Sequence, residues 1–380
     1  MKTLPITAPC FDEAEISALR ACLQSKWVTQ GPLARKFEEL FAQRHQVQYA
    51  LATTSCTAAL HLAASALGLG PGDEVVVPAF TWVTSAHCAE YVGARAVFAD
   101  IDLDTFNLDP EALAAAITPR TQAVVVVHLF GLAAPMEPIL AIARQRSLAV
   151  IEDAACAVGS TYRGRPVGGF GDAGCFSFHP RKVITTGEGG MVTTNRSDIA
   201  SAVASLRNHG ACGHPGPADP SPQPYAMGTF DRLGYNLRLS DIQAAVGVAQ
   251  MAKLDRLLEE RRRLAERYTA LLGGLADVAV PSVPEGCGHT YQAYVIRLRE
   301  GGMARRNAVM EQLARRGIQT RPGTHAVHRL GYYRNKYGLC PDQFPNACLA
   351  EDTSITLPIF PGMSEADQER VVSALKEAVA

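Results

Sequence analysis

The chain has 380 residues, of which 47% are hydrophobic and 19% charged, as in a globular protein with a sizeable core. Its 36 lysines and arginines nearly balance 37 aspartates and glutamates, so we expect neither nucleic acid nor a membrane as partner. No apolar run approaches the roughly 20 residues that cross a bilayer, and no apolar signal core begins the chain, which favours a cytoplasmic protein. The ten cysteines lack C-x-x-C and zinc spacing, which indicates reduced thiols and no metal site.

Between residues 49 and 195, short apolar runs alternate with alanine- and leucine-rich segments that have the spacing of helices. We expect helices at 57–68, 81–92 and 135–146. Buried apolar strands separated by helices predict an α/β fold, with a mainly parallel sheet of about seven strands flanked by helices. The expected strands are YALAT, EVVVPA, RAVFAD, AVVVVHLF, LAVIED, GCFSF and GGMVTT.

Three residues stand at or just beyond the ends of these strands: Trp82, Asp153 and Ser177. Ligands bind at the carboxyl ends of the strands in such sheets, so we expect a site there. A buried Asp153 needs a cation, which either a structural arginine or a cationic ligand would supply. Trp82 suits stacking on a flat ring, and a core aromatic is an equal interpretation.

The segment SFHPRKVITTGEGG, residues 177–190, holds Lys182 between an apolar strand and a glycine-bracketed turn. A lysine by itself is usually a surface residue, but apolar neighbours would desolvate this one, and burial lowers the pKa of a lysine. A lysine amine, a carboxylate and a phosphate pocket are what a protein must supply to pyridoxal phosphate (PLP). Lys182 and Asp153 therefore indicate an enzyme that moves amino groups.

The phosphate pocket is expected at TTSCTAAL, residues 53–60, where a strand ends in hydroxyl residues and a helix begins. Free N–H groups and the dipole at the start of a helix bind phosphate. Ser55 and Thr57 could equally act as simple N-caps, and the two roles are compatible. The hydroxyl of Ser177 could contact the same phosphate.

The rest of the chain divides into a loop, a long helix and a smaller unit. Residues 210–228 are rich in proline and glycine and are expected to form a loop. Ser240 is the expected N-cap of one long helix that ends near residue 272. The predicted division is a large domain (1–240), a connecting helix (241–275) and a small α+β domain (276–380).

Several motifs occur in one order along nearly the whole chain: TTSCTAALHLA, GPGDEVVVPAFTWVTSA, IEDAACAVGS, SFHPRKVITTGEGGMVTTN, RNHG, GYNLRLSDIQAAVGVAQ and TLPIFPGM. Together they resemble the sugar-nucleotide aminotransferases often called the DegT/StrS family, within the fold type I PLP enzymes. The resemblance implies PLP as the cofactor, glutamate as the amino donor and a nucleotide-linked keto sugar as the acceptor.

The resemblance also implies roles for single residues. Lys182 would bond to the cofactor and move a proton between carbons, Asp153 would pair with the pyridine nitrogen, and Trp82 would stack on the ring. Sugar dehydratases of this family have histidine where Lys182 stands, so the lysine favours transamination.

Phosphate contacts are implied for Ser177 and for the backbone around Cys56 and Thr57. Asn236 would reach the phosphate of the neighbouring subunit, which implies a homodimer with shared active sites. One departure concerns Cys156, because the family commonly has glutamine or histidine there, near the phenolic oxygen of the cofactor. A thiol is a weaker hydrogen-bonding partner.

The run GYNLRLSDIQAA looks more like the family's C4 enzymes, which make perosamine-type 4-amino-4,6-dideoxy sugars, than its C3 enzymes. We therefore expect amination of a 4-keto-6-deoxy sugar. A 3-keto sugar or a cyclitol ketone is the alternative, and a PLP-binding regulator is a remote one. The basic and aromatic segment 321–334 suits a nucleotide diphosphate, although a solvated loop fits equally. Its candidate contacts are Arg321, His325 and His328.

Overall fold

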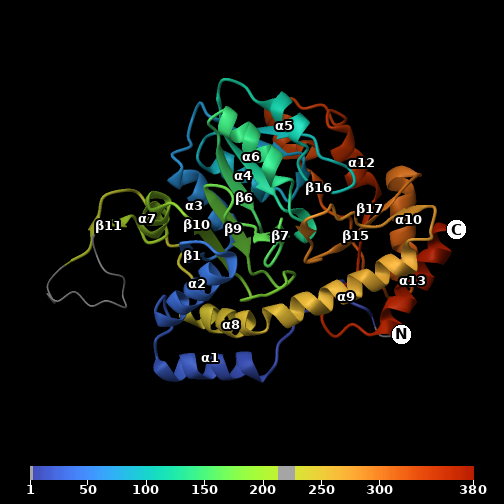
Figure 1. Cartoon of the computed structure of the whole chain (residues 1–380), viewed down its shortest axis with the longest axis horizontal. Coiled ribbons are helices and arrows are strands. Elements are labelled where there is room, and N and C mark those ends of the chain that lie inside the picture. Colours follow the sequence, from blue (N-terminus) through green and yellow to red (C-terminus); the bar gives the residue numbers. More distant parts are fainter. Residues whose placement is uncertain (1–2, 213–226) are drawn as a thin grey trace.

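The computed structural model describes residues 3–212 and 227–380, so most of the loop expected at 210–228 lies outside the described residues. A seven-stranded sheet forms the centre of the larger part, in the order β1-β10-β9-β6-β5-β2-β4 (Figure 1). Its strands are β1 (Tyr49–Thr53), β2 (Glu74–Pro78), β4 (Arg95–Ala99), β5 (Thr121–Val127), β6 (Ala149–Asp153), β9 (Ala173–Ser177) and β10 (Gly190–Thr194).

The sheet is mainly parallel, as the sequence predicts. The pairs β2–β4, β2–β5, β5–β6 and β6–β9 are parallel. Only β10 runs antiparallel to its neighbours, β1 and β9. The carboxyl ends of β5, β6 and β9 therefore meet at one edge of the sheet.

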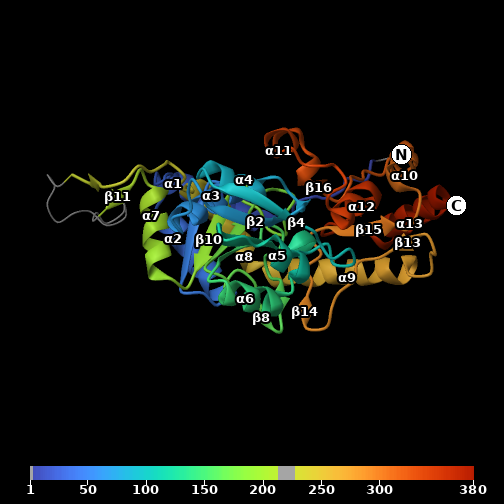
Figure 2. The same ribbon diagram turned by 90° about the horizontal axis from the view of Figure 1, so that it is seen from above.

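Helices cover both faces of this sheet. Val75 and Val77 of β2 pack in one core and Val76 in another, and all three are fully buried. Because side chains alternate along a strand, burial on both faces explains the unbroken apolar run. Figure 2 shows α3 and α4 on one side of the sheet and α5 and α6 on the other. The covering helices are α2 (Pro32–His45), α3 (Cys56–Ala66), α4 (Thr84–Tyr91), α5 (Pro110–Ala116), α6 (Met136–Gln145) and α7 (Ser197–Leu206).

A second apolar core lies against a small antiparallel sheet in the order β13-β15-β17. Leu4 belongs to this core and exchanges backbone hydrogen bonds with Gly317 and Gln319. The start of the chain is thus part of the smaller unit, unlike the predicted division, because this pairing joins residues over 300 positions apart. Its elements are β13 (Val278–Ala279), β15 (Tyr294–Leu298), α10 (Gly302–Arg315), β17 (Ser354–Leu357) and α13 (Glu365–Val379). The helices α11 (Gly331–Tyr337) and α12 (Pro345–Thr353) instead pack their buried side chains into a core of the large sheet.

The long helix predicted from Ser240 is two helices, α8 (Asp241–Ala252) and α9 (Leu254–Leu272). Ser240 does cap α8, in a capping box with Gln243. The break falls at Lys253, whose backbone angles (φ −111°, ψ 8°) are not helical. Its ammonium binds Asp12 at 2.9 Å and Glu15 at 2.7 Å, and the latter lies on α1 (Glu13–Ser25). The apolar spacing continues through the break, which is why the sequence pattern shows one helix.

A short strand pair connects the smaller unit to the large sheet. β3 (Phe80–Thr81) pairs with β16 (His325–Ala326), which places His325 opposite Thr81. None of the described helices combines the length and apolar character needed to cross a membrane. The remaining short elements are η1 (Leu129–Gly131), β7 (Thr161–Tyr162), β8 (Arg165–Pro166), β11 (Ala211–Cys212), β12 (Thr229–Phe230), β14 (Cys287–Gly288) and η2 (Val327–Arg329).

The contact between β10 and the start of α3 gives a stability prediction. A Cβ on Gly190 would lie 2.4 Å from the backbone carbon and oxygen of Ser55 and 2.6 Å from the nitrogen of Cys56. Gly190→Ala should lower the free energy of unfolding by roughly 1–3 kcal/mol, because backbone atoms must move. Urea unfolding measures this, with Gly274→Ala as the control, since that Cβ meets no atom within 4 Å. Equal stability of the two variants would contradict the prediction.

Candidate active site

A cavity of about 380 Å³ opens at the carboxyl ends of β5, β6 and β9. The last residues of these strands, Val127, Asp153 and Ser177, line it. Thr356 and Leu357 of β17 line it as well, so the cavity lies between the large sheet and the small one. This is the sheet edge at which the sequence predicts the site.

Lys182 reaches the cavity from the turn that follows β9. Its backbone N–H donates to the carbonyl oxygen of His179 at 2.8 Å, and its Nζ lies 3.2 Å from Sγ of Cys156. Burial acts to lower the pKa of Lys182, but Cys156 and Asp153 nearby raise it above its ordinary value. The prediction that the pKa of Lys182 is lowered is therefore wrong for the protein without its cofactor. Lys182 is a cation that must lose a proton before its amine can react.

Asp153 is buried, with 4% of its surface exposed. Its Oδ2 accepts a hydrogen bond from Oγ of Ser85 at 2.6 Å, and its Oδ1 accepts one from the backbone N–H of Ala155 at 3.1 Å. Within residues 3–212 and 227–380 it forms no ion pair, so the alternative of a structural arginine is not met. A buried carboxylate without a cation is costly, and a protonated pyridine nitrogen would supply that cation.

The adjacent acid, Glu152, has a structural role instead. Its carboxylate lies 3.0 Å from Nε2 of His128 and accepts three backbone N–H bonds of 2.7 Å, from Gly168, Phe170 and Gly171. Burial acts to raise the pKa of Glu152, but His128 and the N–H groups lower it below its usual range. These bonds fix the end of β6 and thereby the position of its neighbour in the cavity.

The start of α3 forms the part of the cavity expected to take phosphate. Ser55 is the N-cap, and its Oγ accepts from the N–H of Ala58 at 3.1 Å. Cys56 and Thr57 follow at the first helical positions and line the cavity, so Thr57 is not a cap. Ser177 lines the same space. The first N–H groups of a helix have no partner within it and can bind an anion.

Trp82 forms an aromatic wall. It lines the cavity and is 51% exposed, so it is not a core aromatic. The ring of His325 lies 5.7 Å from it, at an angle of 45°, across the β3–β16 pair. The exposed indole face is therefore available to a flat ring.

The candidate contacts for a nucleotide have different surroundings. Arg321 lines the cavity, whereas His325 stands beside Trp82. His328 is fully buried, with Nε2 2.9 Å from the carbonyl oxygen of Pro341, so the structure gives no support to a substrate contact there. Asn236 is exposed and lies outside the cavity of its own chain.

Sequence reasoning missed several residues of the site. Ser85 lies within the motif GPGDEVVVPAFTWVTSA, but its contact with Asp153 depends on the approach of α4 to the end of β6. Arg181 also lines the cavity, and its place beside Lys182 was a usable signal. Other lining residues not predicted from the sequence are Ile6, Thr7, His179, Glu188, Gln292 and Thr324.

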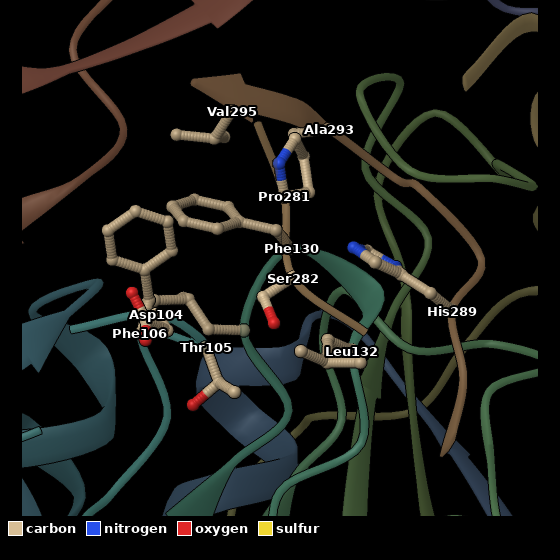
Figure 3. Close-up of a pocket in the computed structure, with 11 residues that line it drawn as sticks. Asp104, Thr105, Phe106, Phe130, Leu132, Pro281, Ser282, His289, Ala293 and Val295 are labelled. Atoms are coloured by element: carbon tan, nitrogen blue, oxygen red, sulfur yellow. The ribbon is translucent and has the colours of Figure 1, made fainter. Parts of the chain in front are cut away.

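A second hollow, drawn in Figure 3, is too small for a cofactor. Its volume is about 10 Å³, close to that of one water molecule. Phe106 and Phe130, with ring centroids 5.7 Å apart, form part of its wall. His289 also lines it, and burial lowers the pKa of this histidine to about 3. The larger cavity is thus the candidate active site.

The arrangement fits PLP on three counts. An amine, a buried carboxylate without a cation and the start of a helix lie around one cavity, and its volume is within the roughly 300–1,000 Å³ usual for ligand pockets. Lys182, Asp153 and the Cys56–Thr57 backbone are the residues that would hold the aldehyde carbon, the ring nitrogen and the phosphate, respectively.

Comparison with known proteins agrees with this arrangement. The model of the DegT/DnrJ/EryC1/StrS aminotransferase family matches residues 9–376. GDP-perosamine synthase of Caulobacter vibrioides is 40% identical over 384 residues, covering 100% of both chains. Spore coat polysaccharide biosynthesis protein SpsC of Bacillus subtilis is 36% identical over 378 residues, covering 99% of this chain and 97% of that one.

Solved structures are similar over the same length. A protein of Streptococcus pneumoniae in its PMP form superimposes with a TM-score of 0.93 at 28% identity, covering 99% of this chain and 98% of that one. Its PLP form gives a TM-score of 0.92. The family resemblance, the fold and the cofactor expected from the sequence are thereby confirmed. The chain belongs to the DegT/DnrJ/EryC1/StrS aminotransferase family, whose cofactor is pyridoxal phosphate.

Proposed function

We propose that the protein transfers the amino group of glutamate to C4 of a nucleotide-linked 4-keto-6-deoxy sugar. The product would be a 4-amino-4,6-dideoxy sugar nucleotide. The observation that carries the proposal is the meeting of Lys182, an unpaired Asp153 and the start of α3 in one cavity. The full-length relative named GDP-perosamine synthase supports a nucleotide sugar as acceptor and C4 as the aminated carbon.

PLP supplies an electron sink when bound, so that an amino group and a proton can move between carbons. Asp153, held by Ser85, is placed to keep a proton on a pyridine nitrogen. Lys182 can then take a proton at Nζ from one carbon and return it to the next. Trp82 and Ser177 line the same cavity, where Trp82 would stack on the flat ring and Ser177 would contact the phosphate.

The cavity also offers cations for the charged parts of both substrates. Arg181 and Arg321 both line the cavity, and burial together with Arg181 lowers the pKa of Arg321. Neither forms an ion pair with a described residue. Two arginines without acidic partners suit the diphosphate of a sugar nucleotide or the carboxylates of glutamate.

We further propose a cytoplasmic homodimer that shares its active sites. Large apolar side chains are exposed just before Asn236: Met227 (89%), Phe230 (61%), Leu233 (87%) and Tyr235 (37%). Exposed apolar patches of this kind are typical of contact surfaces. A partner chain packed on this surface would cover it and bring Asn236 to the neighbouring phosphate site.

The first prediction of this function concerns Lys182. Lys182→Ala should lower kcat by roughly 10²–10⁴-fold or abolish turnover, because the proton carrier is lost. Steady-state formation of 2-oxoglutarate measures the loss, and circular dichroism checks the fold. Lys36→Ala, at an exposed surface lysine, is the control. Full activity of the alanine variant would overturn the proposed role.

A second prediction separates catalysis from stability at Asp153. Asp153→Asn keeps the shape of the side chain but cannot hold a pyridinium by charge, so kcat should fall roughly a hundredfold. The cofactor-free variant should unfold at no lower urea concentration than the wild type, because a buried unpaired charge is removed. Asp255→Asn, at an 83% exposed side chain, should change neither. A destabilised Asn variant with normal kcat would contradict both expectations.

The acceptor is tested with the cofactor absorbance of the purified protein. Glutamate should bleach the visible band, and a nucleotide-linked 4-keto sugar should restore it after glutamate is removed. Return of the band only with a 3-keto sugar or a cyclitol ketone would move the function to those alternatives. If glutamate never bleaches the band, the result would favour a PLP-binding regulator over an aminotransferase.

A further inference from the structure

The residue nearest to the amine of Lys182 is itself a nucleophile. Sγ of Cys156 lies 3.2 Å from Nζ of Lys182, in the turn after β6. Cys156 is partly exposed and lines the cavity, so small solutes that enter the cavity can reach its sulfur. The mechanism proposed above uses Lys182 but gives this sulfur no part.

Cations lie near the sulfur of Cys156. Nζ of Lys182 donates a hydrogen bond to it at 3.2 Å, and Arg321 lines the same cavity. Asp153 is the one carboxylate of the β6 end that faces the same cavity and opposes them. The thiolate is the reactive form of a cysteine, and a neighbouring lysine or arginine stabilises it.

The other cysteine of the cavity lacks these conditions. Cys56 is only 8% exposed, and burial together with Asp153 raises its pKa well above the usual range, so it stays a thiol. The exposed Cys340 is not among the cavity residues. Within the cavity, reactivity is therefore expected at Cys156, which combines access with a bonded cation. Outside the cavity, Cys10 is also partly exposed, and its Sγ lies 4.0 Å from Nη2 of Arg256.

We propose that Cys156 is a modification site for peroxides and small electrophiles in the cofactor-free protein, activated by Lys182 and shielded when the cavity is filled. This inference does not need the sugar substrate. Only the expected consequence of the modification, slower binding of PLP, depends on the proposed role of Lys182.

Hydrogen peroxide is the oxidant in this step. The thiolate attacks one peroxide oxygen, an S–O bond forms, and the O–O bond breaks with hydroxide as the leaving group. Hydroxide takes the proton of the new sulfenic acid, which leaves a sulfenate and water. Sulfur gives up two electrons, and the peroxide is reduced. The sulfenate stays paired with the ammonium group of Lys182 and keeps this group protonated. A protonated Lys182 cannot readily bond to the aldehyde of PLP.

The proposal is tested by measuring the oxidation rate of each cysteine by mass spectrometry. Cofactor-free full-length protein is treated with hydrogen peroxide and dimedone, which labels sulfenic acid, and the rate is read at Cys156, Cys56 and Cys340. Cys156 should react fastest, and PLP loading should slow it about tenfold or more. Lys182→Ala should slow it by about tenfold, because the ammonium group that pairs with the attacking sulfur is lost. Lys182→Arg should keep most of the rate, because it keeps the cation.

Unchanged labelling in Lys182→Ala, with the fold intact by circular dichroism, would overturn the proposal. So would equal rates at Cys156 and Cys340. Peroxide-treated wild type should bind PLP more slowly by absorbance and recover with dithiothreitol, whereas Cys156→Ser should bind at the same rate before and after treatment. If PLP fails to bind even the untreated protein, the proposed function fails, while the labelling rates still decide the reactivity of Cys156.

Discussion

The site depends on how β6 ends. Glu152 and Asp153 are consecutive, so their side chains point to opposite faces of the sheet. The protein itself satisfies Glu152, through His128 and three backbone N–H groups. Asp153 accepts a hydrogen bond from the hydroxyl of Ser85 and forms no ion pair with any described residue. One carboxylate thus fixes the strand, and the other is left without an ionic partner in the cavity.

A second constraint is that the large sheet supplies only part of the cavity. Its strand ends and the start of α3 hold the groups that a cofactor needs. Arg321 and the β17 residues come from the smaller unit, which is joined to the sheet by the β3–β16 pair. The cavity is therefore complete only when both parts of the chain are folded together.

The position of Cys156 beside Lys182 shows that a residue placed for catalysis can also change the reactivity of its neighbour. A cation placed to react with an aldehyde also stabilises any thiolate within hydrogen-bonding distance.

The sequence by itself determined the parts that depend on local patterns. Unbroken apolar runs predicted the seven strands, and the hydroxyl residues around Ser55 and Thr57 indicated where a helix begins. Strand ends placed Trp82, Asp153 and Ser177 at one edge of the sheet. Tertiary structure decided the rest, because each remaining feature joins distant segments. The break at Lys253 requires acids from the first fifteen residues, and the hydrogen bond from Ser85 requires α4 to pack beside β6. The raised pKa of Lys182 likewise arises from side chains that only the fold brings together.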